Sequence, residues 1–215
     1  MRILLNKAHF PVTVLGPGTR VGLWLQGCTI RCRGCISRDT WPADPETAVE
    51  VADVLAWVRG LPADRVDGVT VSGGEPFDQP EALAELLRGL DGWRQESSRP
   101  VDLLAYSGRP LTELRTGFGE VLGLLDAVVS EPFVQGAPTD EALRGSANQS
   151  VVPLTPLGRE RYAGTGLAEQ RGRVQVDVDD ETIWFIGIPR QGDMRRLEEQ
   201  AAAAGITWKR TSWLT

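Results

Sequence analysis

The stretch Cys28-Thr29-Ile30-Arg31-Cys32-Arg33-Gly34-Cys35 contains every cysteine of this chain. A cysteine used only for packing behaves as a small buried hydrophobe, so packing alone gives no reason for three of them to cluster. Thiols spaced C-x-x-x-C-x-x-C instead suit thiolates that converge on one centre, because short spacers let a loop fold around a metal ion or cluster. The stretch therefore predicts a metal or iron–sulfur site.

Three kinds of site could use these thiols. A disulfide would leave one thiol over and needs a secreted context that the chain does not indicate. A structural zinc ion takes four protein ligands, so the three cysteines would need His9, the single histidine. A 4Fe–4S cluster bound by three thiolates leaves one iron without a protein ligand, and that iron is open to another molecule. The cluster is the favoured interpretation, with zinc as the alternative.

Two further loops directly follow predicted strands, as the cysteine stretch does. Gly73-Gly74-Glu75-Pro76 comes after a strand over residues 67–72, and Tyr106-Ser107-Gly108-Arg109 comes after a strand over 101–105. The cysteine stretch itself ends a strand over 20–26. Ligands of parallel sheets bind at the carboxyl ends of the strands, so the three loops are expected on one rim of the sheet.

Strand and helix patterns alternate over the first two thirds of the chain. This alternation is typical of β–α units around a parallel sheet, and right-handed crossovers make such a sheet an incomplete barrel or an open wound sheet. Asp44 and Pro45 favour the start of the first helix, which Gly60 would close. The predicted strands cover 2–5, 11–15, 20–26, 67–72, 101–105 and 127–130, and the predicted helices cover 45–59, 79–88 and 111–125.

The last third of the sequence is less regular. Residues 131–172 are rich in proline, glycine and polar residues, and a loop of that length is uncommon unless it works on a ligand or partner. Order returns in a predicted hairpin (173–178 and 182–188), a helix over 194–204 and a final strand over 206–210. The predicted domains are a core over 1–155 and a C-terminal extension over 156–215, packed on the same domain.

Composition limits the class of protein. Hydrophobic residues make up 41% of the chain and charged residues 24%, which is ordinary for a globular protein. The sequence has no apolar run long enough to span a bilayer and no signal-peptide pattern, so a cytoplasmic location with reduced thiols is expected. The net charge of −6 excludes the basic footprint of a nucleic-acid-binding protein.

The motifs in this order resemble the radical S-adenosylmethionine superfamily. Within it, the chain is most similar to the activating enzymes of the anaerobic ribonucleotide reductase and other glycyl radical enzymes. The matching segments are the cysteine motif with Leu25-Gln26-Gly27 before it and Trp41 after it, Gly73-Gly74-Glu75-Pro76, Tyr106-Ser107-Gly108-Arg109, and Arg144-Gly145-Ser146-Ala147-Asn148-Gln149. The resemblance implies a partial (β/α) barrel of parallel strands, to which the hairpin and helix are added as an extension.

The resemblance also implies the cofactors and their residues. A 4Fe–4S cluster and S-adenosyl-L-methionine would be bound, and one electron would cleave the sulfonium into methionine and a 5′-deoxyadenosyl radical. The implied cluster ligands are Cys28, Cys32 and Cys35, the implied support of the methionine amino group is Gly73, Gly74 and Glu75, and Ser107 and Gly108 are implied near the ribose or carboxylate.

The resemblance implies a radical oxidoreductase that activates a partner glycyl radical enzyme or another protein, with a reduced flavodoxin or ferredoxin-type protein as electron donor. The chain continues well past Gln149, where the small activators end, so action on a small molecule, nucleoside or peptide is the alternative. Two details stay open. Arg144 and Asn148 form either a functional polar cluster or a capped surface turn, and Trp41 either shields the cluster or packs in the core.

Overall fold

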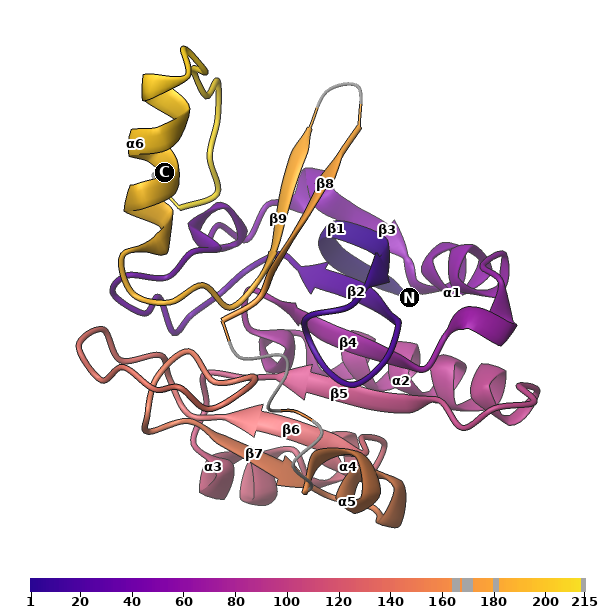
Figure 1. Ribbon diagram of the computed structural model, residues 1–215. Coiled ribbons are helices and arrows are strands. Elements are labelled where there is room, and N and C mark those ends of the chain that lie inside the picture. The colour runs from indigo at the N-terminus through magenta and orange to yellow at the C-terminus, as the bar shows by residue number, and fades with distance from the viewer. Residues whose placement is uncertain (164–166, 168–171, 180–181, 214–215) are drawn as a thin grey trace.

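The computed structural model describes residues 1–163, 167, 172–179 and 182–213. Its centre is a seven-stranded sheet with the strand order β3-β1-β2-β4-β5-β6-β7 (Figure 1). The strands of this sheet are β1 (Arg2–Val12), β2 (Arg20–Leu25), β3 (Ala48–Glu50), β4 (Gly68–Gly73), β5 (Asp102–Tyr106), β6 (Ala127–Ser130) and β7 (Ser150–Pro153). The remaining elements are α1 (Val51–Arg59), α2 (Pro80–Gln95), α3 (Leu111–Gly117), α4 (Gly119–Leu122), α5 (Pro156–Tyr162), β8 (Val174–Val178), β9 (Ile183–Gly187) and α6 (Asp193–Ala203).

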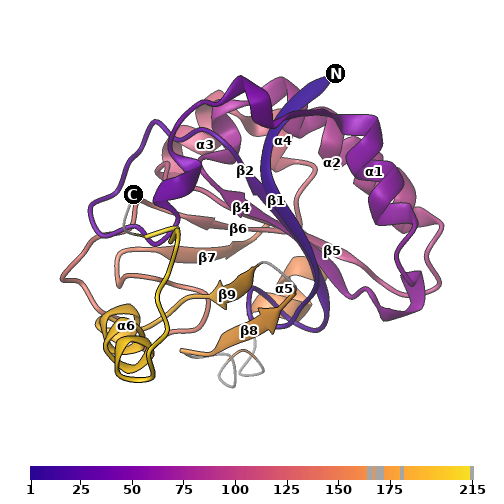
Figure 2. The ribbon, with the colours of Figure 1, turned by 90° about the horizontal axis from the view of Figure 1, so that it is seen from above.

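Four neighbouring strands, β2, β4, β5 and β6, run parallel, and β1, β3 and β7 extend the sheet with antiparallel pairs. Every residue of β2 and β6 is buried, as expected for strands covered on both faces. Figure 2 shows α1 to α4 along one side of the sheet and α5, α6 and the β8–β9 hairpin on the other. The predicted α/β fold with a parallel sheet and a C-terminal hairpin is confirmed.

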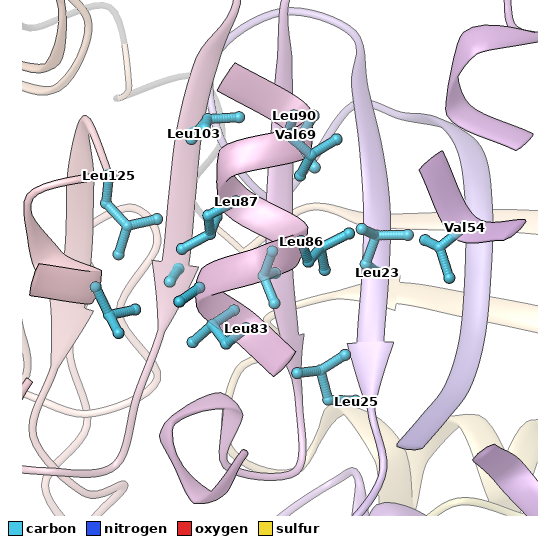
Figure 3. Packing of buried hydrophobic residues seen from close by; sticks show 14 of the residues in the cluster. Leu23, Leu25, Val54, Val69, Leu83, Leu86, Leu87, Leu90, Leu103 and Leu125 are labelled. Carbon is cyan, nitrogen blue, oxygen red and sulfur yellow. The ribbon is translucent and has the colours of Figure 1, made fainter. Parts of the chain in front are cut away.

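Leucines of α2 form the centre of the core between this helix and the sheet (Figure 3). The predicted stripe of Leu83, Leu86, Leu87 and Leu90 is fully buried. Burial of each such side chain stabilises the folded state by roughly 1.5–3 kcal/mol. Gly89 lets α1 approach, because a Cβ at this position would lie 2.2 Å from Cδ1 of Leu55. This packed core fixes the positions of the parallel strands, and the loops at their carboxyl ends extend from it.

Two predictions in the N-terminal quarter are wrong. The expected strand 2–5 and the first two residues of the expected strand 11–15 belong to a single strand, β1, whose start pairs with β3 and whose remainder pairs with β2 through two register shifts, and residues 13–15 form no strand. Asp44 caps only a 3-10 turn, accepting from the amide of Glu46 at 3.0 Å. The chain then forms β3, and α1 begins at Val51.

Three other boundaries differ from the sequence-based expectation. The helix after β4 runs on to Gln95, well beyond residue 88, and the helical stretch 111–125 divides at Phe118 into α3 and α4. The long loop 131–172 contains β7 and α5, which begins with Thr155 accepting from the amide of Gly158 at 3.1 Å and with Pro156 in its first turn. The predicted final strand over 206–210 is wrong, since these residues form no strand.

The hairpin and α6 lie where they were predicted, although the turn residues 180–181 fall outside the described part of the chain. Figure 1 shows the hairpin beside β1 and α6 beyond it. Gln175 joins the hairpin to the end of β1, donating to the carbonyl of Pro11 at 2.7 Å and accepting from the amide of Thr13, just after the strand, at 2.9 Å. The division into a core over 1–155 and an extension over 156–215 stays a prediction. None of the helices in the described ranges is both long and apolar enough to cross a bilayer.

Candidate iron–sulfur site

The cysteine loop begins at the end of β2, and hydrogen bonds join its first residues, 26–28, to the residues 39–42 that follow the cysteines. Gln26, which is 3% exposed, donates to the carbonyls of Asp39 at 3.1 Å and Pro42 at 2.7 Å. The same side chain accepts from Nδ2 of Asn6 on β1 at 2.6 Å. Two backbone hydrogen bonds also join the two ends of the loop. The amide of Gly27 donates to the carbonyl of Thr40 at 2.7 Å, and the amide of Cys28 donates to the carbonyl of Trp41 at 3.1 Å. One buried amide side chain therefore fixes both ends of the loop.

All three cysteines are free and half-buried within this closed loop. Burial is the main influence on each thiol and raises its pKa, while amide groups aimed at the sulfurs act in the opposite direction. Ser37 N donates to Sγ of Cys35 at 3.4 Å, and the amides of Arg31 and Phe133 act on Cys28 and Cys32. Amide donors around cysteine sulfurs are a usual feature of iron–sulfur sites, so this donor set fits a cluster held by three thiolates.

The zinc alternative required His9, and the structure gives this residue another partner. Nε2 of His9 lies 2.8 Å from Oδ2 of Asp177 on β8, and its ring centroid lies 4.9 Å from that of Trp184 on β9. Among the described residues, no three or more His, Cys, Asp or Glu side chains are grouped so as to hold a single metal ion. The position of His9 therefore favours docking of the hairpin over a role as fourth ligand.

The Gly-Gly-Glu loop lies directly against the base of the cysteine loop. Gly74 N donates to the carbonyl of Leu25 at 2.8 Å, and Glu75 N donates to that of Gly27 at 2.9 Å. A Cβ on Gly74 would lie 2.0 Å from the Gly27 carbonyl oxygen, and Gly73 has a φ of +102°. The two glycines are therefore required here for the contact between two loops, a reason that the sequence did not reveal.

Glu75 joins this loop to the one after β5. Its carboxylate accepts from the hydroxyl of Ser107 at 2.8 Å, from the amide of Gly108 at 2.8 Å and from the amide of Phe77 at 3.1 Å. Glu75 is 1% exposed, and this burial raises its pKa to about 7 although the three donors oppose the shift. The predicted site residues Glu75, Ser107 and Gly108 thus form one hydrogen-bonded unit, which confirms that the loops share a rim.

Asp78 is a residue of the candidate site that sequence reasoning missed. Its Oδ2 accepts from the amide of Thr29 at 2.7 Å, and its Oδ1 accepts from the hydroxyl of Thr29 at 2.9 Å and from Arg109 at 2.6 Å. One carboxylate therefore links the loops after β2, β4 and β5. Its place two residues after Pro76, next to a motif already singled out, was the signal that could have identified it.

A cleft of about 1910 Å³ opens beside the cysteine loop. Its lining includes Cys35, Gly73 and Tyr106 together with residues of the hairpin and of the C-terminal segment. The hydroxyl of Tyr106 is buried and has no hydrogen-bond partner among the described residues. Polar atoms of this kind, unpaired and beside a cleft, are suited to bind a ligand.

Arg144 and Asn148 have different environments. Arg144 lines the cleft, and its Nε is buried without a partner in the described part of the chain. Asn148 is exposed and donates to the carbonyl of Pro132 at 2.8 Å, while Gln149 accepts from the amide of Gly145 at 2.8 Å and closes the turn. The segment is therefore a capped turn that presents one arginine to the cleft.

Comparisons with known proteins gave matches by family, by sequence and by structure. The family described as 4Fe-4S single cluster domain matches residues 14–152. The anaerobic ribonucleoside-triphosphate reductase-activating protein of Escherichia coli K12 is 30% identical over 147 residues, covering 66% of this chain and 94% of that protein. The protein of the same name from Vibrio cholerae is 31% identical and covers 68% and 96%. The crystal structure of QueE from Escherichia coli aligns with a TM-score of 0.44 at 16% identity, covering 60% of this chain and 70% of that one.

These matches confirm the resemblance noted from the sequence motifs, and they favour an iron–sulfur cluster over zinc. The matched region contains the cysteine loop, the Gly-Gly-Glu loop and the loop after β5. The chain belongs to the 4Fe-4S single cluster domain family and is a relative of the anaerobic ribonucleoside-triphosphate reductase-activating proteins.

Proposed function

We propose that this chain is a radical S-adenosylmethionine enzyme that activates a partner glycyl radical enzyme by hydrogen abstraction. The observation that carries the proposal is the meeting of three loops, after β2, β4 and β5, the first of which carries three free thiols and brings Cys35 to the edge of one cleft. Cys28, Cys32 and Cys35 are the proposed cluster ligands. The cluster, once bound, supplies one electron that releases methionine and a 5′-deoxyadenosyl radical from S-adenosylmethionine.

The chain's own residues bind and orient the cofactors in this proposal. Gly73 lines the cleft, which supports a role for its backbone in binding the methionine end of S-adenosylmethionine. Glu75 is enclosed by its three donors and acts by holding Phe77, Ser107 and Gly108 in place. Asp78 fixes the cysteine loop relative to both neighbours through Thr29 and Arg109.

The size of the cleft favours a polypeptide segment as the substrate. Small-molecule sites usually measure about 300–1000 Å³, and this cleft of about 1910 Å³ exceeds that range. A glycine-bearing loop of a partner protein could enter it beside Cys35. We propose a cytoplasmic protein, with a reduced flavodoxin or ferredoxin-type donor supplying the electron.

A second candidate is direct action on a nucleoside, peptide or other small molecule. The extension favours it, because aromatic side chains form part of the cleft wall. Phe185 lies edge-on to Trp208 at 5.9 Å and to Trp213 at 6.2 Å between ring centroids. Such a group offers surfaces on which a base or an apolar side chain can stack.

The test uses protein purified without oxygen and analysed for iron, sulfide and zinc. We expect about four irons per chain by the cluster assignment, and 5′-deoxyadenosine after reduction and addition of S-adenosylmethionine. Incubation with a candidate glycyl radical enzyme should then give an organic radical signal in the partner by electron paramagnetic resonance. Zinc in place of iron would refute the proposal, and nucleoside cleavage with no protein radical would favour the second candidate.

A further inference from the structure

The cleft beside Cys35 carries a charge opposite in sign to that of the whole chain. Among the described residues that line this cleft, seven are Lys or Arg and three are Asp or Glu. The full sequence instead has 23 Lys and Arg against 29 Asp and Glu, which gives a net charge of −6. A cleft lined by one sign of charge attracts and orients ligands of the other sign. The ligand expected in this cleft is therefore anionic.

Most of these seven cations have no carboxylate partner. Lys7 pairs with Asp39 at 2.7 Å. Arg190 is exposed and lies 3.9 Å from Asp140. Within the described part of the chain, the remaining five form no ion pair: Arg33, Arg38, Arg144, Lys209 and Arg210. Arg33 and Arg38 belong to the cysteine loop, where their charge favours the thiolate form of the neighbouring cysteines. The other three cations are left to meet a ligand.

Two of these three, Lys209 and Arg210, lie on the C-terminal segment (residues 206–213), which is anchored on either side of them. Before them, Trp208 lies edge-on to Phe185 of β9 at 5.9 Å between ring centroids. After them, the carbonyl of Ser212 accepts from the amides of residues 38 and 39 in the cysteine loop at 2.7 and 3.2 Å. Both cations are exposed. Their backbone is therefore fixed at the cleft while their long side chains remain able to reach a ligand.

A polypeptide suits this wall better than a nucleic acid does. The net negative charge of the chain repels a long polyanion outside the cleft, whereas an acidic stretch of a protein meets the cations only where they gather. The aromatic rings beside Lys209 add apolar surface for the same stretch. We propose that the C-terminal segment binds an acidic stretch of the partner polypeptide, next to the glycine that enters the cleft, with Lys209 and Arg210 as the pairing groups. This inference rests on the proposed function, and it concerns a segment that lies beyond the family match, which ends at residue 152.

The test measures binding of two fluorescent peptides to the full chain by fluorescence anisotropy. One peptide has a central glycine between glutamates, and the other has glutamines in place of the glutamates. We expect the unaltered chain to bind the glutamate peptide more tightly at low salt. The double variant Lys209→Gln with Arg210→Gln should bind it about fivefold more weakly, because each exposed ion pair contributes modestly. This difference should vanish near 1 M salt, where the screening length falls to about 3 Å.

The matched control is the double variant Arg59→Gln with Arg88→Gln. It removes the same charge from exposed positions on α1 and α2, on the other side of the sheet (Figure 2), and should bind as the unaltered chain does. Equal affinity of the unaltered chain for the two peptides would overturn the inference, as would equal affinities of the two double variants for the glutamate peptide. Tighter binding of a labelled single-stranded oligonucleotide than of the glutamate peptide would also overturn it.

The peptide titration is independent of the cluster assignment. An unaltered chain that holds no iron would refute the proposed function. An iron-loaded chain that cleaves S-adenosylmethionine but does not distinguish the two peptides would refute this inference alone, so the two failures are distinguishable.

Discussion

The hydroxyl of Ser107 donates to the carboxylate of Glu75 at 2.8 Å and ties the loop after β5 to the loop after β4. The acid at the centre of this junction is 1% exposed, so it is shielded from the water that would otherwise solvate its charge. The junction lies directly beneath the cysteine loop, since Glu75 N also donates to the carbonyl of Gly27. The protonation of one buried carboxyl is thereby linked to the geometry of the proposed site.

We expect the free energy of unfolding to fall as the pH rises from about 4.5 to about 7. Burial raises the pKa of Glu75 from 4.5 to about 7 in the folded chain, so the folded state binds this proton more tightly than the unfolded state. This proton's contribution to stability is fully present at pH values below the pKa of Glu75 in the unfolded chain. It is lost at pH values above the pKa in the folded chain, and the loss is roughly 3 kcal/mol. Urea unfolding at several pH values measures it.

Glu75→Gln provides the comparison for that titration, because it keeps the size of the side chain and removes the charge. The variant should lose the decrease between about pH 4.5 and pH 7 that the wild type shows. If the difference in unfolding free energy between the two proteins does not change with pH, the junction does not depend on this proton.

Gly74→Ala should disrupt the contact between the Gly-Gly-Glu loop and the cysteine loop. The added Cβ would lie 2.0 Å from the carbonyl oxygen of Gly27, which belongs to the backbone and cannot rotate away. Overpacking of this kind costs about 1–3 kcal/mol, and we also expect weaker binding of S-adenosylmethionine. Thermal unfolding and equilibrium binding measure the two effects.

Gly117→Ala is the matched control for this substitution. A Cβ at Gly117, on α3, would meet no atom within 4 Å, and helical Gly→Ala changes are usually neutral or stabilising by about 0.4–1 kcal/mol. Equal effects of the two substitutions would show that Gly74 is not needed for the loop contact.

The elements that depend on local pattern were predicted well, and those that depend on distant pairing were not. The leucine stripe of α2 and the strand β6 follow from short-range periodicity, and both are confirmed. β3 was missed because three residues become a strand only by pairing with the start of β1. Likewise, the predicted strands 2–5 and 11–15 left residues 6–10 between them unassigned, whereas the side chains of Asn6 and Lys7 are held within β1 by Gln26 and Asp39.

The same distinction applies to the candidate site. Motif spacing was enough to bring Cys28, Gly74 and Ser107 to one rim. The sequence could not show that Glu75 faces inward or that Asp78 joins three loops, because both depend on how closely the loops approach. The cleft wall formed by the hairpin and the C-terminal segment was equally invisible to local pattern.

A buried ion pair at the opposite end of the strands was also missed. Arg20 donates to the two carboxylate oxygens of Asp102 at 3.0 and 2.7 Å, and both side chains are fully buried. Arg161 and the hydroxyl of Tyr162 on α5 donate to the same carboxylate. Although burial alone would raise the pKa of Asp102, the charge of Arg20 and these donors hold it below its ordinary value.

Asp102→Asn should therefore destabilise the fold strongly. The change leaves the guanidinium of Arg20 buried without a counter-charge, and breaking a buried pair in this way costs about 3–5 kcal/mol. Chemical denaturation measures the loss. Asp91→Asn is the control, since Asp91 pairs with Arg94 at 2.8 Å but is 40% exposed, and such pairs contribute about 0–1 kcal/mol. A loss no larger than in the control would mean that Arg20 finds other partners.

Cys32→Ala tests the ligand assignment most directly. Three thiolates are the minimum that holds a cluster with one open iron, so removal of one should abolish cluster assembly and S-adenosylmethionine cleavage. The half-buried thiol contributes little to packing, and we expect the fold to be retained by circular dichroism. Arg33→Ala, at the exposed neighbouring position, controls for disturbance of the loop and should keep its iron. Brown protein with full turnover after Cys32→Ala would be incompatible with the proposed ligands.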